Sequence, residues 1–285
     1  QDGVWDLRLD DHSLHVNNAY TQMLGYAPGE LPAHLTNLWV ELLHPDDIKT
    51  VPRRTLHKFE QSMTVEEEFR MRCKDGSYKW ILCRGGIFSR TPDGIPDRMI
   101  GTHTDITDRK NAEALVWKQA HFDMLTGLPN RRMLRERLEQ EIRRSRRDNQ
   151  QLAILFIDLD HFKKVNDTHG HLVGDRVIQA LGEIMRSSVT NPQHAIARYG
   201  GEEFAILAPQ TSLEQSIQVA ETIRRRTKAM KFRHRNTKEL NLSVSVSVGI
   251  ARMKPGDDAM SLISRSDSAL YRSKAEGRDR LTCAD

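Results

Sequence analysis

Two pairs of carboxylates occur at positions where side chains are usually exposed, one at the end of a predicted strand and one after a predicted turn. The first pair, Asp158 and Asp160, follows the apolar run 152–157, which is typical of a buried strand. Carboxylates that end such a strand lie at the edge of the sheet, where they and substrate phosphates supply the oxygen ligands that Mg²⁺ prefers. The alternative is structural, because either aspartate could simply cap the helix that follows.

The second pair, Glu202 and Glu203, directly follows Gly200 and Gly201. Two glycines between apolar strands predict a tight hairpin, because glycine adopts positive φ and lets other groups approach its backbone. If the hairpin lies beside the first strand, Glu202 meets Asp158. The pair could then hold two divalent cations about 3.5–4 Å apart, which would clamp phosphates and activate a hydroxyl group. The alternative is an ordinary hairpin with a charged tip.

The elements that position these groups follow from hydrophobic periodicity. The pattern predicts helices at 131–147, 162–168, 175–189, 213–230 and 259–275. It predicts strands at 152–158, 195–199, 203–208 and 242–250. This order favours a mixed sheet with helices packed on it, an α/β layered domain.

Together these segments resemble the GGDEF family of diguanylate cyclases, in its GGEEF form. The resemblance runs from Asp123 to about Arg280. It is carried by the opening motif at 123–131, the strand-end motif at 158–167, Gly170-His171, Gly174-Asp175, the hairpin at 198–204, Tyr271-Arg272-Ser273-Lys274 and Gly277-Arg278. It implies a GGDEF fold, a mixed sheet surrounded by helices of the nucleotidyl-cyclase or palm-like type.

The family's reaction makes cyclic di-GMP from two GTP molecules. A ribose 3′-hydroxyl attacks the α-phosphate of a second GTP, pyrophosphate leaves, and the step is repeated in the other direction. Each catalytic domain of the family holds one GTP. The resemblance therefore implies GTP as substrate and a homodimer as the active form.

The resemblance also implies roles for the carboxylates. Asp158 and Glu202 would be the main ligands of Mg²⁺ or Mn²⁺, the Leu159 carbonyl would assist, and Glu203 would complete a metal shell. The expected catalytic residues are Glu202, Asp158 and Lys163, with Glu202 assisting deprotonation of the attacking hydroxyl.

The expected GTP-binding residues fall into two groups. Asn166 and Asp175 would bind the guanine edge, because an amide and a carboxylate together match its acceptor and its N–H donors. The other group would hold or approach the phosphates, with Lys274 and Arg278 expected on one side of a helix end. It comprises the backbone at His161 and Phe162, the Lys163 side chain, Gly200, Gly201, Lys274 and Arg278.

Two features near the site need separate interpretation. Many family members carry an Arg-x-x-Asp product-inhibition motif before the hairpin, but Asn191 and His194 stand at those positions here. We therefore expect no tight feedback by that route. His169 and His171 could be taken for a metal site, and a structural role in a polar loop is the favoured interpretation.

The first 107 residues resemble a PAS domain. The resemblance is loose in each piece and covers Gly3-Val4-Trp5-Asp6, 17–26, Leu43-His44-Pro45-Asp46-Asp47, Lys74-Asp75-Gly76-Ser77 and 101–107. The region predicts an antiparallel sheet with short helices, closing in a meander around turns at 74–77 and 91–94. Its ligand is unknown. His34, His44 and His57 are candidate haem ligands, although capping or packing is the favoured role for His44, and a ligand-free dimerisation module is the alternative.

Residues 108–122 predict a stiff helical connector, because they contain neither glycine nor proline. Ala112, Leu115, Val116 and Ala120 lie on or near one stripe, which suggests a short coiled-coil seam or a helix lying on the next domain. The predicted organisation is thus a PAS sensor domain at 1–107, a signalling linker at 108–122 and a GGDEF domain at 123–285.

Composition limits the possible classes of protein. The chain has 285 residues and a net charge of +4, but residues 1–107 hold 12 basic and 16 acidic residues, while residues 108–285 hold 31 and 23. A basic half suits polyphosphate or nucleic acid equally. Cys73, Cys83 and Cys283 have no metal spacing, and reduced thiols are favoured over a disulfide. No run approaches membrane-spanning length, so we expect no membrane contact. The start at Gln1, without Met, suggests a cytoplasmic piece of a longer protein.

Three functions remain open on the sequence. The first is an active diguanylate cyclase modulated by the PAS domain. The second is a degenerate GGDEF module that binds nucleotide without catalysis, which the intact Asp158, Glu202, Lys163 and Lys274 disfavour. The third is a nucleic-acid-binding regulator, which the lack of a helix-turn-helix or aromatic RNA-binding signature disfavours.

Overall fold

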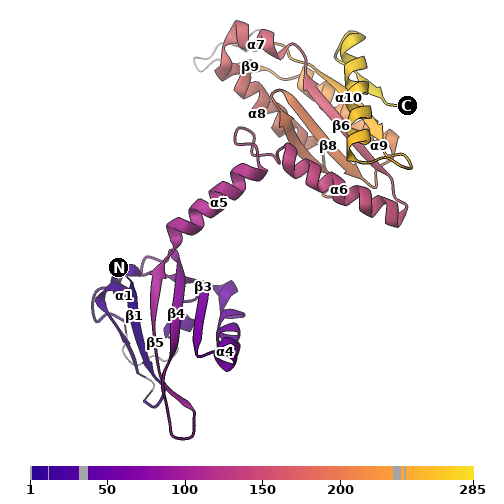
Figure 1. Ribbon diagram of the computed structural model, residues 1–285. Helices are drawn as coiled ribbons and strands as arrows, with labels where there is room; N and C mark the ends of the chain where they lie inside the picture. Colours follow the sequence, from indigo (N-terminus) through magenta and orange to yellow (C-terminus); the bar gives the residue numbers. More distant parts are fainter. Residues whose placement is uncertain (1, 12, 32–37, 234–238, 241) are drawn as a thin grey trace. The chain divides into compact units, whose positions relative to one another are not determined.

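The computed structural model describes residues 2–11, 13–31, 38–233, 239–240 and 242–285. It divides into two compact units, Gln1–Leu115 and Val116–Asp285 (Figure 1). Among the described helices, none combines the length and apolar character that crossing a bilayer requires.

The first unit is built on a five-stranded antiparallel sheet in the order β2-β1-β5-β4-β3. The strands are β1 (Gly3–Arg8), β2 (Leu14–Val16), β3 (Thr64–Arg72), β4 (Tyr78–Arg90) and β5 (Pro96–Asp105). Between β2 and β3 lie the short helices α1 (Asn18–Met23), α2 (Leu38–Glu41) and α3 (Pro45–Ile48), and the longer α4 (Val51–Gln61). The predicted antiparallel sheet with short helices is confirmed. The segment between the predicted turns at 74–77 and 91–94 is the single long strand β4.

Aromatic side chains fill the interior of this unit. Trp5 packs so closely on two neighbouring strands that a Cβ added at Gly85 or Gly101 would lie 2.4 or 2.3 Å from its ring. His103, only 4% exposed, stacks on Tyr20 at 5.0 Å, and burial lowers the pKa of its imidazole to about 3. The imidazole therefore behaves as a neutral core ring, which the sequence analysis did not single out.

The other predictions for this unit concern histidines and cysteines. His44 is the N-cap of α3, and its Nδ1 accepts a hydrogen bond from the Asp46 amide, so the favoured capping role is confirmed. His57 is exposed on α4, and His34 lies outside the described residues. Cys73 and Cys83 are buried, free thiols.

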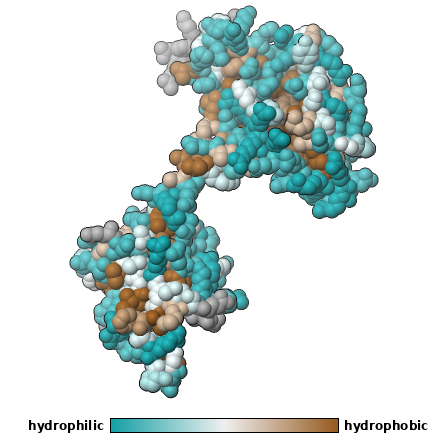
Figure 2. Space-filling view, viewed as in Figure 1, coloured by the Kyte–Doolittle hydropathy of each residue, from teal (hydrophilic) through white to brown (hydrophobic). Residues whose placement is uncertain are grey.

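Helix α5 (Thr107–His121) occupies the predicted connector and buries none of its residues. Leu115, Val116 and Trp117 are each at least half exposed. The space-filling view shows hydrophobic side chains among hydrophilic ones along this helix (Figure 2). These apolar side chains are thus exposed in the single chain, but the three residues are consecutive and point in different directions around the helix, so the predicted stripe on one side is not confirmed.

The second unit is an α/β layered domain around a mixed sheet in the order β12-β11-β6-β8-β7. The strands are β6 (Leu152–Leu159), β7 (Ala195–Gly200), β8 (Glu203–Pro209), β11 (Val246–Arg252) and β12 (Leu281–Cys283), and only the β11–β12 pair is parallel. The helices are α6 (Arg131–Asp148), α7 (Phe162–His169), α8 (His171–Ser188), α9 (Leu213–Lys228) and α10 (Ala259–Ala275). The strands β9 (Phe232–Arg233) and β10 (Glu239–Leu240) form a separate pair.

The predicted mixed sheet surrounded by helices is confirmed, with three differences in detail. Helix α8 begins at His171, four residues before the expected start, and β12 was not predicted. The strand expected at 242–250 begins only at Val246. Just before this start, the Ser245 carbonyl accepts a hydrogen bond from the Asp160 amide, and the Ser245 hydroxyl donates one to the Asp160 carboxylate.

The two faces of this sheet carry different helices (Figure 1). Alternate residues of β6, including Leu155 and Ile157, pack in one apolar cluster with residues of α8 and α9. The intervening residues, including Ile154 and Phe156, pack in another cluster with residues of α6 and α10. Because side chains alternate along a strand, Asp158 continues the second series and lies on the α6 and α10 face.

Candidate functional site

The centre of the site is a group of carboxylates at the ends of β6 and β8. Asp158 on β6 stands opposite Glu203 on β8 and Ser247 on β11 in the sheet register. Asp158 is 5% exposed, and the Leu159 amide donates to the Glu202 carbonyl at 3.3 Å. The hairpin therefore lies beside the end of the first strand, and the carboxylates of both pairs are brought to one edge.

Electrostatics at this edge are unbalanced. Lys274 on α10 pairs with Asp158, with 2.9 Å between Nζ and Oδ2. Burial nevertheless raises the pKa of Asp158 to about 6, because the nearby charges of Glu202 and Glu203 oppose the effect of the lysine. Burial also raises the pKa of Glu203, and Asp267 and Glu202 add to that effect. The edge thus holds more negative charge than its own side chains neutralise.

Such a donor set suits a hard divalent cation. Carboxylate oxygens are the ligands that Mg²⁺ and Mn²⁺ prefer, and the charge of a bound cation would favour the ionised carboxylates, which burial and then the neighbouring negative charges disfavour. The described part of the chain contains no group of three or more His, Cys, Asp or Glu side chains able to hold a metal alone.

Asp160 has a different role from Asp158. Its carboxylate accepts hydrogen bonds from the Ser245 hydroxyl at 2.6 Å, the Ser247 hydroxyl at 2.7 Å and the Asp279 amide at 3.0 Å. Neither aspartate caps α7, whose N-cap is His161 without a side-chain hydrogen bond. Asp160 therefore fastens the end of β6 to β11 and to the turn after α10.

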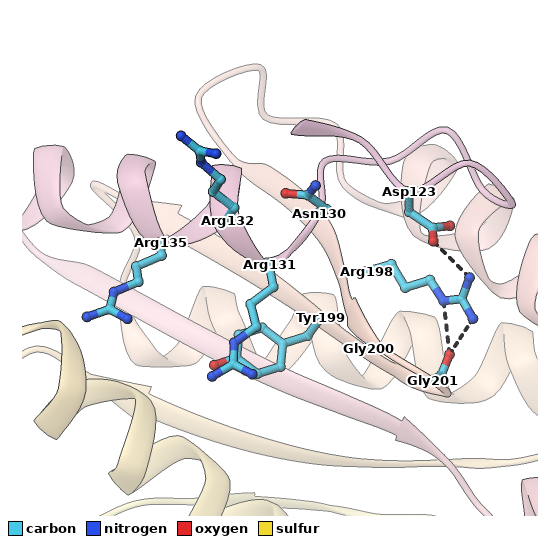
Figure 3. Close-up of a pocket in the computed structure, with 9 residues that line it drawn as sticks. All are labelled: Asp123, Asn130, Arg131, Arg132, Arg135, Arg198, Tyr199, Gly200 and Gly201. Carbon is cyan, nitrogen blue, oxygen red and sulfur yellow. Dashed lines mark hydrogen bonds and ion pairs between the residues drawn. The ribbon is translucent and has the colours of Figure 1, made fainter. Parts of the chain in front are cut away.

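The hairpin turn is held by an arginine that the sequence analysis did not single out. Arg198 on β7 donates to the Gly201 carbonyl at 2.9 and 2.7 Å and pairs with Asp123 at 2.9 Å (Figure 3). Gly201 has φ +47°, and an added Cβ at Gly200 or Gly201 would meet nothing within 4 Å. The turn is thus fixed from inside and open to an approaching ligand from outside. The signals for this clamp in the sequence were Asp123, at the start of the opening motif, and Arg198, at the start of the hairpin motif.

The expected guanine-binding residues lie on adjacent helices. Asn166 is on α7, and its buried Oδ1 has no hydrogen-bond partner. A Cβ at Gly174 would lie 1.9 Å from that oxygen, so only glycine leaves room for the amide. Asp175 is exposed on α8. A buried acceptor without a partner is costly, which is consistent with a missing ligand group, and the guanine role stays a prediction.

The expected phosphate-binding groups lie at the start of α7, near the end of α10 and in the turn after α10. His161 has φ +56°, and Lys163 is exposed in the first turn of α7. The expectation that Lys274 and Arg278 share one side of a helix end is wrong. Helix α10 ends at Ala275, Gly277 takes φ +115°, and Arg278 follows in a left-handed turn with φ +62°.

The remaining expectations around the site concern histidines. His169 ends α7 and His171 begins α8, so both lie at helix ends flanking Gly170 and not in a polar loop. Asn191 and His194 stand where many family members have the product-inhibition motif. The His194 amide donates to the Asn191 carbonyl at 3.1 Å, and His194 Nε2 lies 2.7 Å from the Thr211 hydroxyl. Residues 191–194 therefore form a turn fastened to the chain, and weak feedback stays a prediction.

Comparison with known proteins identifies the family. Residues 120–280 match the family model "Diguanylate cyclase, GGDEF domain", and residues 13–103 match the model "PAS fold". Because the first match covers more than half of the chain, the chain belongs to the GGDEF family, with a PAS-fold region before it.

Individual relatives agree with this assignment. The chain is 42% identical over 167 residues to the diguanylate cyclase DgcP of Pseudomonas aeruginosa, covering 59% of this chain and 24% of DgcP. It is 32% identical over 243 residues to a diguanylate cyclase of Vibrio cholerae, covering 84% of this chain and 74% of that protein. Among solved structures, it resembles the coiled coil and GGDEF domain of DgcB from Caulobacter crescentus in complex with c-di-GMP. There the TM-score is 0.59 and the identity 32%, covering 63% of this chain and 93% of DgcB's.

Proposed function

We propose that this chain is a diguanylate cyclase that condenses two GTP molecules into cyclic di-GMP and two pyrophosphates. The observation that carries the proposal is the carboxylate edge, where buried Asp158 faces Glu203 and has a raised pKa despite its lysine partner. Perturbed carboxylates at a sheet edge are typical of catalytic sites. The relatives that carry the name diguanylate cyclase support the same reaction.

Asp158 and Glu202 would be the main ligands of Mg²⁺ or Mn²⁺, the Leu159 carbonyl and Glu203 would assist, and substrate phosphates would supply the remaining oxygen ligands. When bound, the metal would supply charge stabilisation on the phosphates and lower the pKa of the attacking hydroxyl. Lys274 would exchange Asp158 for the phosphates of the nucleotide, because a flexible ammonium group can follow the added negative charge. Asn166 and Asp175 would orient guanine, and Lys163 and Arg278 would bind phosphate.

The bonds made and broken balance in each of two equal steps. The 3′-oxygen of one GTP forms a bond to the α-phosphorus of the other, while the bond between the α-phosphorus and the bridging oxygen breaks. Pyrophosphate leaves with the electron pair, and Glu202 accepts the hydroxyl proton on a carboxylate oxygen. Since one domain would hold one GTP, the active form would be a homodimer, with its activity set by the PAS-fold region.

The test is incubation of the purified chain with GTP and Mg²⁺, followed by chromatography of the products. We expect cyclic di-GMP and two equivalents of pyrophosphate. GTP that binds but is not consumed would instead favour the alternative, a GGDEF module that acts only as a nucleotide-binding regulator.

A further inference from the structure

A basic pocket lies beside the hairpin on the face of the sheet that carries α6. Its volume is about 650 Å³, within the range of ligand-binding pockets. Its lining contains four arginines and only one carboxylate, so the pocket is basic. The lining comprises Asp123, Asn130, Arg131, Arg132, Arg135, Arg198, Tyr199, Gly200 and Gly201 (Figure 3).

The arginines of the pocket differ in how strongly they are held by other protein groups. Arg198 is committed to Asp123 and Gly201. Arg132 and Arg135 are exposed and pair with Glu136 and Glu139 one turn along α6, and such surface pairs contribute little and are easily exchanged. The pocket can therefore offer guanidinium groups to an anion without breaking its own framework.

Arg131 is the arginine best placed to act on the reaction. Its guanidinium carbon lies 4.7 Å from the centre of the Tyr199 ring, and that ring packs edge-on against Phe156 at 4.8 Å. Phe156 precedes Asp158 by two residues and points to the same face of β6. Arg131 is also near enough to Glu203 for the two side chains to interact electrostatically. Arg131 thus stands beside the carboxylate edge on the α6 side, as Lys274 does on the α10 side.

The pocket and the expected guanine site lie on opposite faces of the sheet. Residues of α7 and α8, the helices of Asn166 and Asp175, pack on one face, and residues of α6 pack on the other. A nucleotide held by α7 and α8 would reach the carboxylates around the end of the sheet, because Asp158 lies on the α6 and α10 face. The α6 pocket, separated from it by the hairpin, remains available to a second nucleotide.

We infer that this pocket receives the GTP presented by a second copy of the chain, with Arg131 on its phosphates and the Tyr199 ring beside its base or ribose. The inference rests on the proposed function, which requires two GTP molecules to meet at the carboxylates. A planar guanidinium suits phosphate oxygens because it can donate two parallel hydrogen bonds. In a two-fold symmetric dimer the arrangement is reciprocal, so each half-site is incomplete without Arg131 of the other copy.

Single substitutions give the first test. Arg131→Ala should lower the rate of cyclic di-GMP formation by about tenfold or more, as loss of one phosphate-binding donor typically does, and Arg131→Lys should retain part of it. Arg147→Ala is the matched control, since Arg147 is on α6 away from the pocket and pairs with Asp148. Thermal melting checks that each variant folds. Parental turnover in Arg131→Ala would overturn the inference.

Mixed dimers test whether Arg131 acts on the partner's nucleotide. Two differently tagged copies are co-expressed and purified through both tags, and one half-site is disabled with Asp158→Asn. A dimer with one competent half-site can form only one bond and releases the linear dinucleotide pppGpG, as the parent paired with Asp158→Asn should show.

The copy that carries Arg131→Ala then shows on which nucleotide Arg131 acts. With Arg131→Ala and Asp158→Asn on opposite copies, the competent half-site keeps the partner's Arg131 and should form pppGpG near the control rate. With both changes on one copy, the competent half-site loses that arginine and should be slowed about tenfold or more. The reverse order, or equal rates, would overturn the inference. Failure of the unmodified chain to make any cyclic di-GMP would instead refute the proposed function.

Discussion

Two buried carboxylates, one in each unit, are handled in opposite ways. Glu67 in the first unit is 4% exposed and pairs with both Arg54 and Lys58. Burial alone would raise its pKa, but hydrogen bonds from these two cations outweigh burial, and the pKa of Glu67 is lowered. Asp158 in the second unit is 5% exposed, has one lysine and faces other carboxylates, and its pKa rises to about 6.

The difference separates a carboxylate that stabilises a fold from one that is prepared for a ligand. A buried charge that is fully paired holds its neighbours in place, whereas a buried charge left partly uncompensated costs stability until something positive binds. Asp160, two residues after Asp158, differs from it in the same way as Glu67 does. Its carboxylate accepts three hydrogen bonds from the protein and so has a structural role.

The largest expected effect is on turnover. Glu202→Gln should lower the rate of cyclic di-GMP formation by about a thousandfold or more, because loss of a metal ligand and proton acceptor removes several kcal/mol of transition-state stabilisation. Initial rates with GTP and Mg²⁺ measure the effect. A rate within tenfold of the parent would mean that the carboxylate edge is not the reaction centre.

A smaller effect is expected on base selection. Asn166→Ala combined with Asp175→Ala should weaken GTP binding by roughly 1–3 kcal/mol per lost partner, because guanine donors and acceptors lose their matches. Competition between GTP and ATP for the parent and the double variant measures it. An unchanged preference for GTP would show that other residues select the base.

The connector should also affect turnover. Inserting four residues near Ala114 turns the later part of helix α5 by about 40° and shifts it by about 6 Å relative to the earlier part, so turnover should change severalfold. A seven-residue insertion, about two turns, should be milder because an apolar seam returns to register. Initial rates are compared at equal dimer fraction. Parental rates in both would mean that α5 is a passive tether.

The smallest expected effects are on stability, and they have opposite signs. The raised pKa of Asp158 means that its favourable contribution is complete below its ordinary pKa of 3.8 and is lost as pH rises through about 6. Without divalent metal at pH 7.5, Asp158→Asn should therefore raise the melting temperature by a few degrees. The lowered pKa of Glu67 contributes stability above its ordinary value of 4.5, which is lost as pH falls through the native pKa. Glu67→Gln should therefore lower the melting temperature at pH 7.5, and equal shifts of one sign in both variants would contradict the contrast.

The sequence predicted the parts of this account that depend on local pattern. An apolar strand that ends in carboxylates and a Gly-Gly turn between two strands are short-range features, so Asp158 and the hairpin were found together. The connector helix was found because fifteen residues without glycine or proline have few other regular conformations.

The missed features depend on residues far apart in the chain. The clamp between Arg198 and Asp123 spans 75 positions, and the Asp160 network joins β6 to residues 85 to 119 positions away. No periodicity reports such pairs. The turn at Arg278 was missed because an i, i+4 spacing was applied across the predicted end of the helix at residue 275, where the positive φ of Gly277 and Arg278 turns the chain away from the helix.

The most direct test of the contrast between Asp158 and Glu67 is one chromatographic assay of three proteins. The parent, Asp158→Asn and Glu67→Gln are incubated with GTP and Mg²⁺ at a temperature where all three are folded, and cyclic di-GMP is quantified over time. We predict product from the parent, product from Glu67→Gln at a rate within a fewfold of the parent, and none above background from Asp158→Asn. Product from Asp158→Asn at the parental rate, or none from the folded parent, would contradict the account.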